Sequence, residues 1–434
     1  MSFFEKLFKL QENKTDVRTE ILAGVTTFVT MAYIIFVNPG ILSKTGMPFG
    51  SVLVATCLGS SLACFLMAFL ANYPFALAPG MGLNAFFAFT VVLTMGISWQ
   101  VALAAIFVEG VIFVLLTLTK VRESVVNSIP TSLKIGISAG IGLFITFIGL
   151  QSSGIIVDNP AVLVGLSSFR KMPPSQLLAL IGLFLMVAFE YKKVRGGILL
   201  GIIITTVLAI PFGIAKMPAA IVSMPPSLAP IFCKMDFSSI AKGSFWVIVF
   251  TFFFVDFFDT VGTLIGVSNR ADMLDKDGRL PKASAALMSD AIGTVAGAVL
   301  GTSTVTTYVE SASGVAAGGR TGLTAFTVGI LFLLATFFSP LISIVPSCAT
   351  GPALIMVGGY MMMGFKDMKY DDWTEFFPAL MATFMMPFAY SIATGIEFGV
   401  VSYAIIKLIT GRGKEVHWIV YILSLAFILN HAFL

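Results

Sequence analysis

The sequence predicts an all-α polytopic membrane protein with about fourteen transmembrane segments, because charge is scarce and apolar residues are abundant. Of its 434 residues, 11% are charged and 57% are hydrophobic, whereas a soluble domain carries about 25% charged residues. The mean hydropathy of +0.98 also indicates a membrane protein. A helix crosses the hydrocarbon core in about 20 apolar residues, so about fourteen crossings leave short connections and no sizeable soluble domain.

Apolar stretches follow one another along the chain as two series of about seven. The first series covers 20–37, 51–71, 75–95, 99–119, 134–151, 176–190 and 197–214, and the second covers 243–267, 284–300, 303–318, 322–345, 347–364, 374–394 and 396–410. A further stretch, 418–434, leaves two alternatives open. Either it lies at the membrane interface, or two of the shorter stretches form one broken crossing.

From the fourth predicted crossing onward, basic residues recur after every second one, as the positive-inside rule requires of cytoplasmic loops. They are Lys120 and Arg122; Lys192, Lys193 and Arg195; Arg270, Lys276, Arg279 and Lys282; Arg320; Lys366 and Lys369; and Arg412 and Lys414, with Arg170 and Lys171 as exceptions in a longer external loop. The basic N-terminal segment precedes an apolar run without a cleavage pattern. We therefore expect a multi-pass protein of the cell membrane (plasma or inner membrane) whose N-terminus is cytoplasmic.

An internal repeat is indicated by a shift of 234 residues, which places Gly59 on Gly293, Ala63 on Gly297 and Gly80 on Gly314. An odd number of segments in each half implies two repeats of inverted topology. The third segment of each half is also the least regular, with Pro74, Pro79 and Gly80 in one and a Thr/Ser/Gly run at 301–314 in the other. We expect both segments to be interrupted helices that flank a binding site near the membrane midplane.

Several classes of function are excluded by composition. The net charge of +4 is scattered and no basic stripe with interleaved aromatic residues occurs, so we expect no nucleic-acid partner. The four cysteines form no C-x-x-C pair, and both histidines, His417 and His431, lie near the C-terminus without a carboxylate cluster. A histidine-based catalytic triad or metal site is therefore not expected, and we expect neither an enzyme nor a bound metal or cofactor.

The informative residues are acids inside the apolar stretches, because a carboxylate in the bilayer costs a few kcal/mol. No Lys or Arg is expected at comparable depth, so these acids must be protonated, hydrogen-bonded or in contact with a wet cavity. This is the chemistry expected of a proton carrier. The six acids are Glu109, Asp256, Asp259, Asp290, Glu310 and Glu397.

Asp256, Asp259 and Thr263 lie three and four residues apart, so a helix places them on one face. They either form hydrogen bonds between helices or belong to a substrate and proton site. Glu310 lies beside the interrupted tenth segment, whose freed backbone N–H groups also suit a ligand.

Among the remaining candidates, Asn84 and Asp290 keep two interpretations each. Asn84 offers a donor and an acceptor to a heterocycle, or it caps the broken third segment. Asp290 either supports Asp259 or begins a helix, and Glu109 and Glu397 suit structural roles. The acidic loop 272–278 lacks the last ligand of a calcium loop and is interpreted as a solvated connector.

Five stretches together resemble the AzgA-type purine permeases of the nucleobase/cation symporter 2 family. They are 17–28 (VRTEILAGVTTF), 38–39 (NP), 78–87 (APGMGLNAFF), 258–266 (FDTVGTLIG) and 308–324 (YVESASGVAAGGRTGLT). The likeness runs in order from about Phe3 to Arg412. It implies a uracil-permease-like fold in which the third and tenth segments carry short antiparallel strands at the substrate site.

The resemblance also implies a division of the chain. Residues 20–120 and 243–345 would form a core (transport) domain, 121–242 and 346–411 a gate domain, with a cytoplasmic N-terminus at 1–19 and a C-terminal segment at 412–434. The implied activity is proton-coupled uptake of adenine, hypoxanthine or guanine. The implied partners are the purine base and the lipid bilayer, and a homodimer stays open.

Site residues carry over by position. Asp259 matches the eighth-segment acid that binds the base, Glu310 with its neighbour Ser311 matches the tenth-segment site, and Asn84 matches an essential asparagine of the third segment. Asp256 matches a second acid found in some members. Thr263 stands where related uracil carriers have a proton-relay histidine, and threonine does not store a proton at physiological pH.

The resulting hypothesis places Glu310 and Asp259 on the ring edge of a neutral purine, with Asn84 closing the site. Asp259, Glu310 or Asp290 then carries the co-transported proton. The alternatives are an anion transporter of the same architecture, a sodium-coupled nucleobase carrier and a membrane-embedded enzyme that uses paired acids.

Overall fold

The chain folds into two compact units, which are described separately below. A computed structural model describes residues 3–119, 130–160, 163–168, 172–218, 220–271, 273 and 280–433. The first unit comprises Met1–Thr117 and Gln151–Ala353, and the second comprises Leu118–Leu150 and Leu354–Leu434. Lys120, Arg122, Arg170, Lys171, Lys276, Arg279 and most of the acidic connector 272–278 lie outside the described residues.

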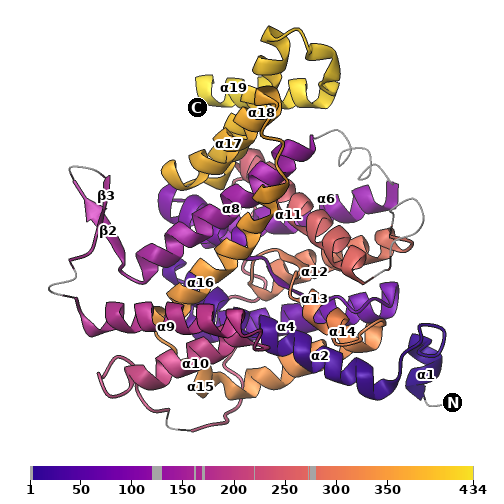
Figure 1. The fold of residues 1–434 in the computed structure, drawn as a ribbon, viewed down its shortest axis with the longest axis vertical. Helices are drawn as coiled ribbons and strands as arrows, with labels where there is room; N and C mark the ends of the chain where they lie inside the picture. The colour runs from indigo at the N-terminus through magenta and orange to yellow at the C-terminus, as the bar shows by residue number, and fades with distance from the viewer. Residues whose placement is uncertain are drawn as a thin grey trace. The chain divides into compact units, whose positions relative to one another are not determined.

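The described residues form mainly helices, most of which are joined by short connections, whereas the connection at 210–242 is long (Figure 1). Up to residue 209 the helices are α1 (Phe3–Phe8), α2 (Val17–Met31), α3 (Ile34–Leu42), α4 (Phe49–Leu66), α5 (Met81–Ala85), α6 (Trp99–Thr119), α8 (Thr131–Ser152), α9 (Pro174–Tyr191) and α10 (Gly197–Ala209). The later helices are α11 (Gly243–Arg270), α12 (Ala283–Leu300), α13 (Ser311–Ala316), α14 (Gly322–Ala335), α15 (Ser339–Ile342), α16 (Ser347–Met362), α17 (Trp373–Phe388), α18 (Ile392–Ile409) and α19 (Trp418–Phe433). Four short strands are β1 (Leu77–Pro79), β2 (Ile156–Asn159), β3 (Leu163–Leu166) and β4 (Val305–Thr307).

Each predicted apolar stretch coincides with a helix or with a broken helix, in the predicted order. In the described part of the chain, nine helices are long and apolar enough to cross a membrane, and Met81–Thr94, Gly197–Ala209 and Gly243–Phe257 are shorter apolar helices. The polytopic helical fold is therefore confirmed. Two details differ from the prediction: a turn at Ala32–Tyr33 divides the first stretch into α2 and α3, and the loop predicted to be external contains the exposed hairpin β2–β3.

The two interrupted segments meet through their extended parts, as predicted. β1 precedes α5 and pairs antiparallel with β4, which precedes α13, in the register Leu77↔Thr307, Ala78↔Thr306 and Pro79↔Val305. The strand pair is buried throughout. Pro79 lacks an N–H group and Gly80 has no side chain, so neither favours a continuous helix at this point.

The internal repeat is visible where α4 crosses α12. A Cβ atom placed on Gly293 would lie 2.9 Å from Cβ of Ala63, and one on Gly59 would lie 3.9 Å from Cα of Gly297. The sequence shift of 234 residues equates Gly59 with Gly293 and Ala63 with Gly297. Gly59 therefore faces Gly297, the equivalent of Ala63, and Ala63 faces Gly293, the equivalent of Gly59. Two reciprocal contacts of this kind are the pattern that a two-fold axis produces.

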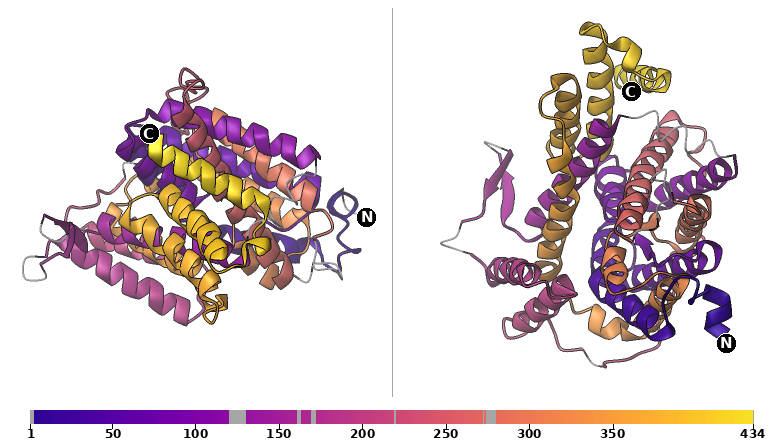
Figure 2. Two further views of the ribbon diagram at one scale, coloured as in Figure 1. Left: turned by 90° about the horizontal axis from the view of Figure 1, so that it is seen from above. Right: turned by 45° about the vertical axis from the view of Figure 1, so that its right-hand side comes forward.

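A buried acid, Glu20, fixes the packing of α2 against α14, which lies beside α2 and α4 (Figures 1 and 2). Its carboxylate accepts hydrogen bonds from the N–H groups of Arg320, Thr321 and Thr324 and from the Thr324 hydroxyl at 2.6 Å. These groups surround the N-terminus of α14, where N–H groups lack partners within the helix. Glu20 is thus a structural cap that the sequence interpretation did not count among the buried acids.

The second unit contains an ionic cluster around Lys407, which corrects the expectation that no basic residue is buried in an apolar stretch. Lys407 lies in the last turn of α18 and its side chain is fully buried. Its ammonium contacts carboxylate oxygens of Glu375 and Glu415, each at 2.8 Å. Arg412 contacts Glu415 at 2.8 Å and Asp372 at 2.7 Å. The cluster joins α17, α18 and the segment that follows α18.

Replacement of Lys407 by methionine is expected to destabilise the protein by about 3 kcal/mol, because it leaves the largely buried Glu375 without its charged partner. The pKa of Glu415 is lowered from 4.5 to about 2 by hydrogen bonds from Arg412 and Lys407. A lowered carboxyl pKa stabilises the fold above the ordinary pKa, and this contribution disappears as the pH falls toward 2. Thermal unfolding of the purified protein in detergent should show a constant difference between wild type and variant from pH 7 to pH 5.

Below about pH 4.5 the difference should shrink. The matched control is Lys414→Met, since Lys414 is exposed and lies in the segment that follows α18. Equal melting temperatures for Lys407→Met and Lys414→Met would contradict the structural importance of the cluster.

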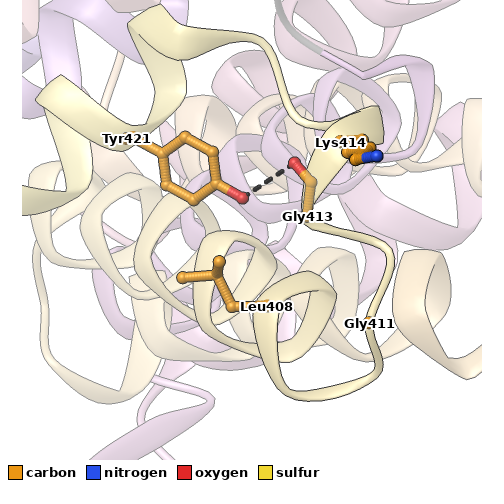
Figure 3. A pocket seen from close by; sticks show the side chains of 5 residues that line it. All are labelled: Leu408, Gly411, Gly413, Lys414 and Tyr421. Atoms are coloured by element: carbon orange, nitrogen blue, oxygen red, sulfur yellow. Dashed lines mark hydrogen bonds between the residues drawn. The ribbon is translucent and has the colours of Figure 1, made fainter.

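The last apolar stretch forms α19, which is 16 residues long and so shorter than a crossing requires. One face packs on α18, where the Ser424 hydroxyl donates to the Val400 carbonyl at 3.3 Å, whereas Trp418, Ile422 and Leu425 are exposed. This arrangement favours the interfacial alternative. A pocket of about 560 Å³ lies at the turn from α18 to α19, beside Lys414 and Tyr421, but it contains no predicted site residue (Figure 3).

The core and gate domains stay a prediction, because the two compact units do not show which parts of the chain move together during transport.

Candidate functional site

The candidate site is built at the junction of the two interrupted segments in the first unit. The strand pair is extended by the Tyr308 N–H group, which donates to the Ala76 carbonyl at 2.9 Å, and by the Tyr308 hydroxyl, which donates to the Pro79 carbonyl at 2.6 Å. Glu310 follows two residues later and stands at the N-terminus of α13. The short strands therefore place Glu310 where the helix begins again.

Glu310 is partly exposed, and one of its carboxylate oxygens is held by the protein. The Tyr33 hydroxyl donates to Oε1 of Glu310 at 2.6 Å, which is the short distance typical of an O–H···O⁻ bond. In the described part of the chain, Oε2 of Glu310 accepts no hydrogen bond. This second oxygen is left to accept a hydrogen bond from a ligand.

Asp259 in α11 shows the same division of its two oxygens. The Thr306 hydroxyl, from β4, donates to Oδ2 of Asp259 at 3.3 Å. The Asp259 side chain is partly exposed, and its Oδ1 has no hydrogen bond among the described residues. Asp259 and Glu310 are close enough to interact electrostatically. The site therefore presents two carboxylate oxygens, each on a side chain whose other oxygen is held by a hydroxyl group of the protein.

Asp256 lies one helical turn before Asp259 but has a different environment. It is fully buried, and the hydroxyl of Thr260 lies 3.2 Å from its Oδ1 and 3.0 Å from Oδ1 of Asp290. The Thr260 hydroxyl thus bridges two buried carboxyl groups, one on α11 and one on α12. Asp290 lies in the middle of α12, so the interpretation that it begins a helix is wrong. Its carboxyl group contacts the hydroxyl of Thr260, which follows Asp259 in α11.

The tripeptide 302–304, which directly precedes β4, is held by three buried polar side chains from the first repeat. Asn84 accepts a short hydrogen bond from the Ser303 hydroxyl, and its amide lies 3.4 Å from the Pro79 carbonyl. The Ser303 contact links the two interrupted segments, whereas the Pro79 contact lies within the segment formed by β1 and α5, as expected of a structural cap. The three pairs, one from each of α3, α5 and α6, are Asn38 with Thr302, Asn84 with Ser303, and Glu109 with Thr304.

The other predicted site residues occupy less accessible positions. Ser311 is buried, and its hydroxyl accepts a hydrogen bond from the Ala76 N–H group at 2.9 Å, so it ties α13 to the segment before β1. Thr263 is 7% exposed and follows Asp259 by one turn. Glu397 is buried in α18, in the second unit, and is described only there.

Two residues of the site were missed by sequence reasoning, namely Tyr33 and Thr306. Each places a hydroxyl group on a site carboxylate. Tyr33 is separated from Glu310 by 277 residues, and no spacing pattern connects the two. Thr306 was included in the irregular Thr/Ser/Gly run, but nothing in the sequence singled it out from the other threonines there.

The arrangement suits a neutral ligand that carries N–H groups, since both free oxygens are hydrogen-bond acceptors. Among the described residues, no lysine or arginine bonds to Asp259 or Glu310, so the site offers no charged partner to an anion. The fold and the site together define a polytopic membrane permease with a carboxylate-lined site between two interrupted segments.

The family is shown by a match that covers most of the chain. The family model Xan_ur_permease, described as "Permease family", matches residues 18–398, and the chain belongs to this family.

Relatives cover the chain almost completely. It is 52% identical to a putative permease of Methanocaldococcus jannaschii (100% of this chain and 99% of the relative), and 47% identical to the guanine/hypoxanthine permease PbuG of Bacillus subtilis (98% and 99%). It is 44% identical to the adenine permease AdeQ of Escherichia coli (98% and 95%).

Solved structures share the fold at low sequence identity. The transmembrane domain of the cyanobacterial bicarbonate transporter BicA superposes with a TM-score of 0.66 at 13% identity, over 88% of this chain and 97% of that domain. SLC26A9 superposes with a TM-score of 0.64 at 11% identity, over 91% of this chain and 66% of the other. The uracil-permease-like architecture implied by the resemblance is thus confirmed.

Proposed function

We propose that this permease imports purine nucleobases, namely adenine, hypoxanthine or guanine, across the cell membrane together with a proton. The observation that carries the proposal is the pair of free carboxylate oxygens on Asp259 and Glu310. Purine bases are neutral and present ring N–H groups that such oxygens accept. The names of the relatives PbuG and AdeQ support the same ligand class.

In the proposed cycle the base enters between the two interrupted segments, and Glu310 and Asp259 accept hydrogen bonds from its ring edge. Asn84 closes the site from the third segment. Protonation of one acid outside raises the affinity for the base, and release of that proton inside frees the base. The proton carrier is Asp259, Glu310 or Asp290, because Thr263 cannot store a proton at physiological pH.

The proposed orientation places the N-terminus and the basic loops in the cytoplasm. The partners are then the base, the bilayer and the co-transported proton, without a cofactor or nucleic acid. A homodimer stays a prediction.

Anion transport is the second candidate, because the fold neighbours include a bicarbonate transporter. A fold shared at 13% identity does not indicate a shared substrate. An anion also prefers a basic residue or a helix N-terminus to two carboxylates, so purine transport is the better explanation of the site.

The decisive measurement is uptake of labelled hypoxanthine by cells that lack their own purine carriers and express this chain. We expect adenine, hypoxanthine or guanine in excess to compete, and a protonophore to abolish accumulation. Uracil and bicarbonate serve as competitors that should have no effect. Uptake that requires sodium and resists the protonophore would replace proton coupling by sodium coupling, and competition by bicarbonate alone would contradict the purine assignment.

A further inference from the structure

Tyr33 occupies a special position, the turn between α2 and α3, with its side chain 1% exposed. Its hydroxyl group reaches across to α13 and donates to Oε1 of Glu310 at 2.6 Å. An apolar ring of the same size would fill the space, so packing alone does not explain the hydroxyl.

The contact with Glu310 is the last of three that follow one another along α2 and the turn after it, and that meet α13 and the residue before it. Thr27 faces Gly314, where a Cβ atom would lie 2.0 Å from Oγ1 of Thr27. Thr30 shares a hydrogen bond of 2.9 Å with the Ser313 hydroxyl. The first two contacts hold the helix itself. Tyr33 alone of the three acts on the carboxyl group, whose terminal torsion is otherwise soft.

We propose that Tyr33 is a positioning residue that decides which oxygen of Glu310 meets the transported base. The Tyr33 hydroxyl occupies Oε1, so Oε2 is presented to a ring N–H group. This inference rests on the proposed function, since it assumes that Glu310 contacts the base. Without the hydroxyl, the carboxyl group turns between several orientations, and binding must select one of them at a cost in affinity.

The geometry makes a specific prediction for the amide variant Glu310→Gln. In that variant we expect the Tyr33 hydroxyl to keep its role as donor, so that it holds the amide oxygen and turns the NH₂ group toward the base. A donor then opposes the donor of the ring, which repels the ligand. When Tyr33 is also replaced by phenylalanine, the amide can turn and offer its oxygen to the base. The double variant should therefore bind at least as tightly as Glu310→Gln alone.

The experiment measures the dissociation constant of hypoxanthine on purified full-length protein in nanodiscs, with uptake rates in cells beside it. Tyr33→Phe is expected to weaken binding about tenfold, as expected for a lost hydrogen bond to a charged group, with the maximal uptake rate changed less than twofold. Two controls accompany it. Thr30→Val removes the neighbouring bond between the same helices, and Tyr73→Phe removes another buried hydroxyl, which accepts from the Lys282 N–H group at 3.1 Å.

The outcomes separate the two proposals. Wild-type affinity in Tyr33→Phe, with impaired binding in Glu310→Gln, would overturn the role of Tyr33 and leave the site intact. Unchanged binding in both variants would overturn the proposed site itself. Equal losses in Tyr33→Phe and Thr30→Val, or a double variant weaker than Glu310→Gln, would show that Tyr33 only supports the fold.

If Tyr33→Phe does not fold, p-aminophenylalanine at position 33 carries the test. This residue keeps the ring and a donor at its tip, so we expect an affinity within about threefold of wild type. An affinity as low as that of Glu310→Gln would overturn the proposal.

Discussion

Replacement of Glu310 by glutamine, or of Asp259 by asparagine, is expected to lower purine uptake by about 100-fold. Each change removes a charged acceptor from the ring edge, and each hydrogen bond to a charged group contributes about 1.5–3 kcal/mol. A loss of about 2.8 kcal/mol corresponds to about 100-fold in affinity. The measurement is the initial rate of labelled hypoxanthine uptake, divided by the amount of protein in the membrane.

Asp256→Asn is the matched comparison, because Asp256 lies on the same helix, three residues before Asp259. Asp256 is fully buried and contacts the hydroxyl of Thr260, so its replacement should act on folding. We expect less protein in the membrane with a nearly normal rate per molecule. Asp259→Asn should give the opposite result, with normal abundance and a low rate. Wild-type uptake in both Glu310→Gln and Asp259→Asn would remove these two acids from the transport site.

The sequence was enough to predict which acids lie in apolar stretches, but not which of them are accessible in the candidate site and which are buried. Hydropathy located Asp256, Asp259, Asp290 and Glu310 inside apolar stretches, and helix periodicity placed the first two on one face. The structure separates them, because Asp259 meets a hydroxyl of β4 whereas Asp256 meets Thr260 beside α12. A rotation of a fraction of a turn decides which partner an acid reaches, and periodicity does not resolve that difference.

Contacts between distant parts of the chain explain the other omissions. Glu20 was noted only as part of a motif, because its partners on α14 are about 300 residues away in the sequence. Tyr33 was one aromatic residue in an apolar run, and Lys407 stood near the end of a segment, where basic residues are normally solvated. In contrast, the interrupted segments were predictable, since proline, glycine and runs of threonine and serine act locally on the backbone.

The close approach of α13 to α2 positions Glu310. This approach requires a glycine at position 314, where there is no side chain. A Cβ atom there would lie 2.0 Å from Oγ1 of Thr27 and 2.8 Å from the Ala23 carbonyl oxygen. Since the carbonyl belongs to the backbone of α2, rotation of one side chain cannot relieve the second clash. α13 would have to move away by about 1 Å, and Glu310 at its N-terminus would move with it.

Gly314→Ala is therefore expected to lower uptake by about 100-fold, the loss that a displacement of about 1 Å at a reacting or binding group can produce. The free energy of unfolding should fall by about 1–3 kcal/mol as well. Gly359→Ala is the control, because a Cβ atom at that helical glycine has nothing within 4 Å. Adding Thr27→Ala to Gly314→Ala should restore only part of the uptake, since it removes the hydroxyl clash and leaves the backbone clash. Full activity of Gly314→Ala would show that α13 can shift without disturbing Glu310, and the position of the carboxylate would then depend on Tyr33 rather than on the docking of the helix.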